Sequence, residues 1–218
     1  MKKMILAAMM AVACAFGGTA EALQPELGNQ ASSVVEAKAS RENMDVTYPV
    51  WKGGSILAHA KVNSAVETEI YSFYKALPKE DEFGTPRGYV SWQVGAHGHG
   101  VLSYVLTEST MMPRAAHPTH YVVGMNFRDD GSKITYEDIM KMIPKRSGEE
   151  IRAEIVKQTK EEGIPLFGEE LNHIQTWPKN FYIGQDGGIY FIFQTYDIAP
   201  YAAGWIGIRG GTLKWWNR

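Results

Sequence analysis

The stretch FYIGQDGGIYFIFQTYDIAPYAAGWIGI, residues 181–208, is the densest apolar and aromatic run in the chain after the N-terminal segment. It contains Asp186-Gly187 between two apolar runs, which is a strong signal for a β-hairpin. We therefore expect strands over residues 181–184 and 189–196. In the second strand both alternating sets of side chains are largely apolar, so this strand should be central and covered on both faces.

Residues 197–204, DIAPYAAG, interrupt this alternation. Pro200 has no backbone N–H to donate to a sheet, and Gly204 tolerates positive φ angles. The segment is therefore expected to be a shaped loop, after which a further strand covers residues 205–208.

Three amphipathic helices are predicted from capping signals and periodicity. Ser64 begins a Ser-x-x-Glu capping box, and apolar residues then recur at helical spacing until Pro78, which predicts a helix from Ser64 to Leu77. Thr135 and Ser147 are the expected N-caps of two further helices.

Alternating segments predict the remaining strands, at residues 44–50, 89–95, 101–108 and 119–127. Residues 55–62 are either a partner strand or an extended segment, and residues 164–178 are expected to be irregular. Helices do not alternate regularly with strands, which disfavours a doubly wound parallel sheet. We therefore expect an α+β fold with a mainly antiparallel sheet and helices packed on it.

The composition fits a globular domain with a substantial core, since the 218 residues are 44% hydrophobic and 21% charged. The formal net charge is −2. Because there is no basic excess, nucleic acid is not an expected partner.

The first 22 residues have the organisation of a secretory signal peptide. Lys2 and Lys3 precede an apolar run that is too short to span a bilayer, and residues 20–22, Ala-Glu-Ala, supply a cleavage pattern. We expect an exported protein, periplasmic or secreted, whose mature chain begins near Leu23. Cleavage leaves 20 basic and 23 acidic residues, a formal charge of −3. Residues 23–43 are polar without a clear period and are expected to form a flexible lead.

Cys14 is the only cysteine, and it lies in the apolar part of the signal peptide. It is either an ordinary residue that is removed on processing or the lipid attachment site of an anchored lipoprotein. If cleavage follows Ala22, the mature chain contains no thiol and forms no disulfide, so its stability must come from its core.

Four histidines are the candidate metal ligands. His97 and His99 lie two residues apart in a predicted turn, and His117 and His120 lie in the next loop. Such imidazoles could hold zinc, which would suit an envelope hydrolase or a metal-binding protein. The surrounding glycines favour a mobile turn instead, and the sequence has no His-Glu-x-x-His motif, so no metal or other cofactor is expected. The sequence also lacks a Gly-x-Ser-x-Gly elbow and a dinucleotide fingerprint, so no catalytic residue is assigned.

Aromatic residues are concentrated in the last quarter of the chain. Core packing is the simplest interpretation for Phe191, Phe193 and Tyr196. Other aromatic side chains could pack in the core or contact a protein or a sugar. These are Tyr201, Trp205, Trp215 and Trp216.

Residues 196–204, YDIAPYAAG, resemble a signature of the extracellular domain of RsiV-type anti-sigma factors. The related non-catalytic domain of PdaC-type peptidoglycan deacetylases belongs to the same family of domains of unknown function. Asp197 stands where the family has Glu, and Pro118 is among the residues that replace the family's glycines around His117. Supporting matches follow the family's order, at Tyr48-Pro49, Asn63, Ala116-His117 and residues 126–139.

The resemblance covers residues 44–208 and implies an α+β envelope domain of two intimately packed halves, here residues 44–110 and 111–218. Some relatives bind lysozyme and others accompany cell-wall enzymes. We therefore expect a non-enzymatic binding domain whose ligand is a lysozyme-type protein or peptidoglycan. The candidate binding residues are Tyr196, Asp197, Pro200, Tyr201, Trp205 and His117.

Overall fold

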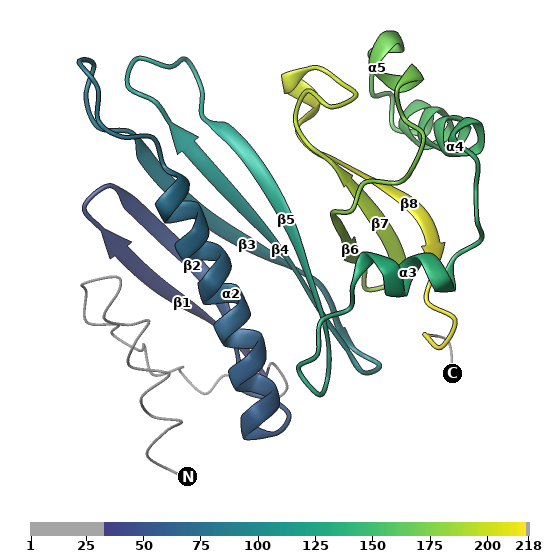
Figure 1. The fold of residues 1–218 in the computed structure, drawn as a ribbon, viewed down its shortest axis with the longest axis horizontal. Helices are drawn as coiled ribbons and strands as arrows, with labels where there is room; N and C mark the ends of the chain where they lie inside the picture. Colours follow the sequence, from purple (N-terminus) through teal and green to yellow (C-terminus); the bar gives the residue numbers. More distant parts are fainter. Residues whose placement is uncertain (1–32, 217–218) are drawn as a thin grey trace. The chain divides into compact units, whose positions relative to one another are not determined.

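The structure is a computed structural model that describes residues 33–216 (Figure 1). The predicted signal peptide, Cys14 and the first part of the predicted lead lie outside these residues. The described chain contains a five-stranded sheet, a three-stranded sheet and helices that pack on them. The predicted α+β class is therefore confirmed.

The larger sheet has the strand order β1-β2-β3-β4-β5 and is mostly antiparallel. Its strands are β1 (Val34–Arg41), β2 (Met44–Trp51), β3 (Arg87–Gly98), β4 (Val101–Met111) and β5 (Thr119–Arg128). β1 and β2 pair antiparallel, whereas β2 and β3, which are separated in sequence by a helix, pair parallel. The strands predicted in this part of the chain, from residue 44 onward, are all confirmed, with longer bounds.

The expected flexible lead is wrong for residues 34–41, because these residues form β1. The strand pairs along its whole length with β2, from Val34 opposite Trp51 to Arg41 opposite Met44. Its sequence, VVEAKASR, alternates apolar and polar residues from Val35 to Ser40, a period-two signal for a strand that the expectation of a flexible lead overlooked. Two of the apolar residues are alanines, which have low β-propensity, so the strand depends on its pairing with β2.

The first long helix, α2 (Ile56–Ala76), begins earlier than predicted. Ser55 is its N-cap and accepts a hydrogen bond from Ala58 N at 3.1 Å, whereas Ser64 lies inside the helix. Residues 55–62 are thus mainly helical, which corrects the expectation of a strand or extended segment. The end of the helix is as predicted, with Leu77 as its C-cap before Pro78.

Helix α2 packs on β2 through a stripe of buried residues and one buried amide. Ala58, Val62, Val66 and Ile70 recur every four residues and are buried. The Asn63 side chain accepts from Trp51 N at 2.8 Å and donates to Trp51 O at 2.9 Å. Because this amide is bonded on both sides, it fixes α2 against the end of β2.

The smaller sheet has the order β6-β7-β8 and contains the predicted hairpin. β6 (Phe181–Ile183) and β8 (Ile206–Thr212) both pair antiparallel with β7 (Gly188–Phe193). β7 is therefore the central strand, as expected. Gly187 has a φ of 70°, a conformation that suits glycine in the tight turn between β6 and β7.

Three helices accompany the smaller sheet: α3 (Tyr136–Met142), α4 (Gly148–Glu161) and α5 (Gly168–Asn172). Thr135 and Ser147 are the N-caps of α3 and α4, and each forms a complete capping box, which confirms both predictions. α5 was not expected, because residues 164–178 were predicted to be irregular. It has only five residues and no side-chain cap, so it carries little local signal.

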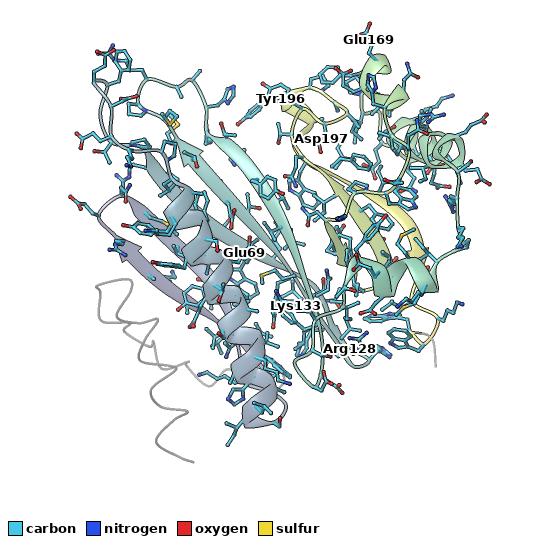
Figure 2. The ribbon with its side chains drawn as sticks, viewed as in Figure 1. Glu69, Arg128, Lys133, Glu169, Tyr196 and Asp197 are labelled. Carbon is cyan, nitrogen blue, oxygen red and sulfur yellow. The ribbon has the colours of Figure 1, made fainter. Side chains whose placement is uncertain are left out.

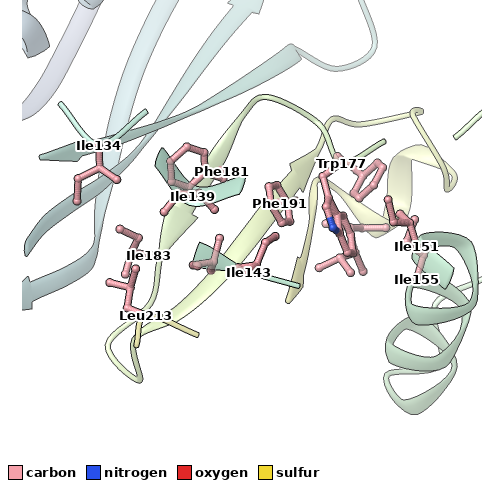
Figure 3. Packing of buried hydrophobic residues seen from close by; sticks show 14 of the residues in the cluster. Ile134, Ile139, Ile143, Ile151, Ile155, Trp177, Phe181, Ile183, Phe191 and Leu213 are labelled. Carbon is pink, nitrogen blue, oxygen red and sulfur yellow. The ribbon is translucent and has the colours of Figure 1, made fainter. Parts of the chain in front are cut away.

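One face of the smaller sheet carries the main hydrophobic cluster (Figure 3). Phe191 and Phe193 of β7 are buried in it, as predicted, together with Ile151 and Ile155 of α4. The Phe191 ring stacks on Trp177, with centroids 4.6 Å apart and planes at 9°. Burying side chains of this size contributes about 2–3 kcal/mol each, so this cluster is a major source of stability.

Side-chain amides connect β5 to the edge of the smaller sheet. Asn126 Nδ2 donates to Phe181 O at 2.7 Å, and Asn126 Oδ1 accepts from Ile183 N at 3.2 Å. Asn180 forms a similar pair of bonds with the backbone of β5. These bonds satisfy backbone groups that a short edge strand would otherwise leave unpaired.

The chain forms two compact units. One contains the residues up to Trp92 together with Thr107–Thr119, and the other contains Gln93–Leu106 and the residues from His120 onward. β3 and β4 each contribute to both units. No helix within residues 33–216 is long and apolar enough to cross a membrane.

Candidate functional site

The loop with the family resemblance is held at its start by side-chain hydrogen bonds. Gln194 Oε1 accepts from Val122 N at 2.8 Å, and Gln194 Nε2 donates to Val122 O at 2.9 Å. Asp197 Oδ2 accepts from Gln194 N at 2.6 Å. The candidate residue Asp197 therefore caps the end of the hairpin and helps to fix the loop to β5.

Tyr196 protrudes from this loop (Figure 2). Its φ is 74°, in a region that residues other than glycine rarely adopt, and 54% of the residue is exposed. The expectation that Tyr196 packs in the core is therefore wrong. β7 ends at Phe193 instead of at residue 196 as predicted, so Tyr196 lies in the turn after the strand and does not share its buried faces.

Two further rings lie beside Tyr196. The Tyr196 and Tyr201 centroids are 5.8 Å apart, and the Tyr201 ring is 6.2 Å from His120 in a stacked arrangement. Tyr196, Tyr201 and His120 thus form a continuous aromatic group, which we call the Tyr196 surface. Tyr201 and His120 are both partly buried and support the more exposed Tyr196.

The middle of the loop anchors it to the fold. Ile198 and Ala199 are buried, and Ile198 O accepts from Phe167 N at 2.8 Å. Pro200 is the N-cap residue of the short 3-10 helix η1 (Tyr201–Ala203). Pro200 therefore shapes the loop by starting η1.

Trp205 lies on the second face of the smaller sheet, away from the main hydrophobic cluster. Tyr182 of β6 and Tyr190 of β7 are cross-strand neighbours on this face, with ring centroids 4.9 Å apart and planes at 12°. Trp205 is 6.0 Å from Tyr182 and nearly perpendicular to it, at 84°. With Gln93 and Gly95 of β3, these rings line a cavity of about 380 Å³, which we call the aromatic pocket.

Asp186 lies at the rim of the aromatic pocket with three partners. Its carboxylate accepts from Gly188 N at 2.9 Å and from the Tyr190 hydroxyl at 3.0 Å, and it lies 3.2 Å from Arg209 Nη1. Burial opposes the charge of Asp186, but these hydrogen bonds and the guanidinium outweigh it and lower its pKa. Burial also raises the pKa of Tyr182 to about 12, with help from the neighbouring Tyr190 and Asp186.

Tyr182, Tyr190 and Asp186 are not among the site residues expected from the sequence. A signal was present, because each tyrosine is four residues from Asp186 on opposite sides of the Asp-Gly turn. A hairpin centred on that turn pairs the two tyrosines directly. The residues of β3 that complete the pocket are distant in sequence and carry no such signal.

The histidines proposed as metal ligands have different neighbours. His99 packs on Trp216 at 4.7 Å, and His120 stacks beside Tyr201. His117, a candidate binding residue, is exposed, and its Nδ1 lies 3.2 Å from Pro118 O. Within residues 33–216 no three His, Cys, Asp or Glu side chains are grouped so as to hold a metal ion. The described structure therefore does not assemble the alternative metal site.

Residues 132–209 match the family DUF3298, a protein family of unknown function. The matched residues include the loop at 196–204 and six residues of the aromatic pocket: Tyr182, Gly184, Gln185, Asp186, Tyr190 and Trp205. The match to DUF3298 thus supports the resemblance at the level of this domain family.

A solved DUF3298 protein shares the fold. A member from Bacteroides fragilis NCTC 9343 is 16% identical with a TM-score of 0.51, covering 81% of this chain and 88% of that chain. A DUF3298 family protein from Pseudomonas aeruginosa PAO1 is 11% identical with a TM-score of 0.49, covering 84% of this chain and 91% of that chain. The chain matches no curated protein.

Proposed function

We propose that the protein is an exported, non-enzymatic binding domain of the cell envelope whose partner is a lysozyme-type protein. The observation that carries this proposal is the Tyr196 surface, in which an exposed tyrosine is held at a positive φ of 74°. Backbone strain of this kind costs about 1–3 kcal/mol and is concentrated at ligand-binding positions.

The Tyr196 surface has the properties of a protein-binding anchor. Tyrosine is enriched among residues that dominate binding energies, because its ring buries a large apolar area and its hydroxyl finds a polar partner. Gln194 and Asp197 already fix the loop through hydrogen bonds. Association would therefore require little additional ordering of the backbone.

The choice of partner rests on the resemblance. Residues 196–204 resemble the RsiV-type extracellular domains, some of which bind lysozyme. The formal charge of −3 after removal of residues 1–22 is compatible with a basic partner but is too small to select one. The signal-peptide pattern of residues 1–22 would deliver the protein to the compartment in which such a partner acts.

The test is retention of the mature protein, residues 23–218, on immobilised lysozyme and, in parallel, on insoluble peptidoglycan. We expect retention on lysozyme, which Tyr196→Ala abolishes and Tyr71→Ala preserves. Tyr71 is a suitable control because it is a 40% exposed tyrosine on α2. Retention on neither material would refute the proposal, and retention on peptidoglycan alone would refute lysozyme as the partner.

The non-enzymatic part of the proposal has a separate test. Purified peptidoglycan incubated with the mature protein should release no soluble fragments and gain no free amino groups. Either product, if it formed with the protein and not with a heat-denatured sample, would identify the protein as a hydrolase or deacetylase and would overturn this part.

A further inference from the structure

The aromatic pocket and the Tyr196 surface are built from different residues. The pocket cavity of about 380 Å³ falls in the range of about 300–1,000 Å³ that is usual for small-ligand sites. Its walls combine three aromatic rings with the polar side chains of Gln93, Gln185 and Asp186. This mixture of flat apolar walls and a polar rim suggests a small, hydroxyl-bearing ligand.

Glycines make room for the two tyrosine rings. A Cβ atom at Gly184 or at Gly188 would lie 2.7 Å from Tyr190 Cε2, and one at Gly207 would lie 3.1 Å from Tyr182 Cε1. Any other residue at these three positions would push against the rings. The tyrosines therefore lie flat over bare backbone, which keeps their ring planes nearly parallel.

The three rings form a corner. Tyr182 and Tyr190 stack on one another, so each ring covers one face of the other, and Trp205 stands almost at a right angle to Tyr182, at 84°. All three residues are only partly buried, so part of each ring surface faces the cavity. A flat ligand can contact the tyrosine stack and the tryptophan at the same time.

The one charged side chain among the residues that line the pocket, Asp186, has a counterion. Asp186 is held by the Tyr190 hydroxyl and lies 3.2 Å from Arg209, so its negative charge already has a counterion. A carboxylate has about four lone-pair sites and Asp186 already has three partners, so it retains capacity for about one further hydrogen bond. This arrangement favours a neutral hydroxyl donor over a cation or an anion.

We propose that the aromatic pocket binds a saccharide, with one pyranose ring against Trp205 and the tyrosine pair and one of its hydroxyls bonded to Asp186. A pyranose combines an apolar C–H face with a rim of hydroxyl groups, which matches the aromatic rings and the polar rim. The saccharide site does not require the protein partner of the Tyr196 surface.

The test is an NMR titration of the ¹⁵N-labelled mature protein with three neutral oligosaccharides: the trimer of N-acetylglucosamine, cellotriose and maltotriose. We expect at least one to cause saturable shifts of the backbone amides of Gly95, Gly184 and Gln185, which line the pocket. Absence of shifts with all three sugars, or shifts confined to residues outside the pocket, would overturn the saccharide site.

Pocket variants give a second readout. Trp205→Ala removes one wall and should weaken binding about tenfold, and Asp186→Asn removes the charged acceptor and should weaken it about fivefold. Tyr190→Phe keeps the ring and its packing and loses only the hydroxyl that donates to Asp186. We therefore expect a smaller loss of saccharide affinity than in Trp205→Ala or Asp186→Asn. Unchanged affinity in both Trp205→Ala and Asp186→Asn would also overturn the site.

The variant Tyr196→Ala tests whether saccharide binding is independent of the proposed binding to lysozyme. It should leave saccharide binding unchanged while abolishing retention on lysozyme. Loss of saccharide binding in Tyr196→Ala would contradict the assignment of the ligand to the aromatic pocket.

Discussion

Glu108 on β4 is a buried carboxyl group, with only 6% of the residue exposed. Its Oε1 has no hydrogen-bond partner among the described residues. Burial, and secondarily the Glu69 carboxylate of α2 (Figure 2), raise the pKa of Glu108 to about 7. Nothing in the sequence distinguished this glutamate from the surface carboxylates, because its environment comes from packing across the fold.

The first prediction concerns the pH dependence of stability. The pKa of Glu108 is higher in the folded than in the unfolded protein, so its favourable contribution is complete below about pH 4.5 and is lost as pH rises through about 7. Glu108→Gln should therefore have a free energy of unfolding about 2 kcal/mol higher than wild type at about pH 8. At about pH 4.5 the two proteins should differ little in stability. Urea denaturation of both proteins at the two pH values measures this. A constant difference between them would contradict the assigned burial.

Tyr196 supplies a second prediction at the residue scale. Its φ of 74° suits glycine, so Tyr196→Gly should be more stable than Tyr196→Ala by about 1 kcal/mol, although both lose the ring. Thermal denaturation of the two variants tests this. Equal stability would mean that the loop relaxes out of the positive-φ region. The sequence predicted a strand through Tyr196 and a shaped loop from Asp197, whereas β7 ends at Phe193 and Tyr196 points outward from the turn, because no local signal marks the end of the strand.

At the scale of secondary structure, the two capping boxes were predicted correctly from local sequence. The errors concern elements whose position depends on contacts with distant segments. Thr135 and Ser147 were recognised as N-caps because a capping box is contained within four residues. β1 was missed although residues 35–40 alternate between apolar and polar, because its alanines and charged side chains have low β-propensity. The start of α2 was misplaced because Ser55 and Ser64 are both plausible caps, and burial of the first helical turns on β2 decides between them.

The contact between β5 and β6 gives the prediction at this scale. A Cβ at Gly124 would overlap the Phe181 carbonyl carbon and oxygen, so Gly124→Ala must push the two strands apart. We expect a loss of about 3 kcal/mol of unfolding free energy in urea denaturation. Gly168→Ala is the matched control, because its Cβ meets no atom within 4 Å and should change stability by less than about 1 kcal/mol. Similar effects of both substitutions would contradict the close approach.

At the scale of the whole molecule, the sequence predicted the fold class and the loop at residues 196–204. It did not predict the aromatic pocket, whose lining comes from β3, β4, the β6–β7 hairpin and Trp205. Those segments are brought together only by the folded sheets. The family match likewise covers only residues 132–209, so the fold of the preceding residues is known from the structure and not from the match.

The predicted export of the chain gives a further prediction. Cleavage after Ala22 should produce a mature protein that begins at Leu23, which intact-mass measurement of the exported protein detects. Incorporation of a labelled fatty acid that disappears in Cys14→Ser would show a lipid anchor instead and would contradict cleavage at Ala22.

Binding of a lysozyme-type muramidase to the mature protein, measured by titration calorimetry, tests the proposed function most directly. We predict saturable binding by wild type and Tyr71→Ala, and binding at least about tenfold weaker by Tyr196→Ala. Equal affinity for Tyr196→Ala and wild type, or no heat of binding with wild type, would contradict the assignment of the Tyr196 surface as the binding site.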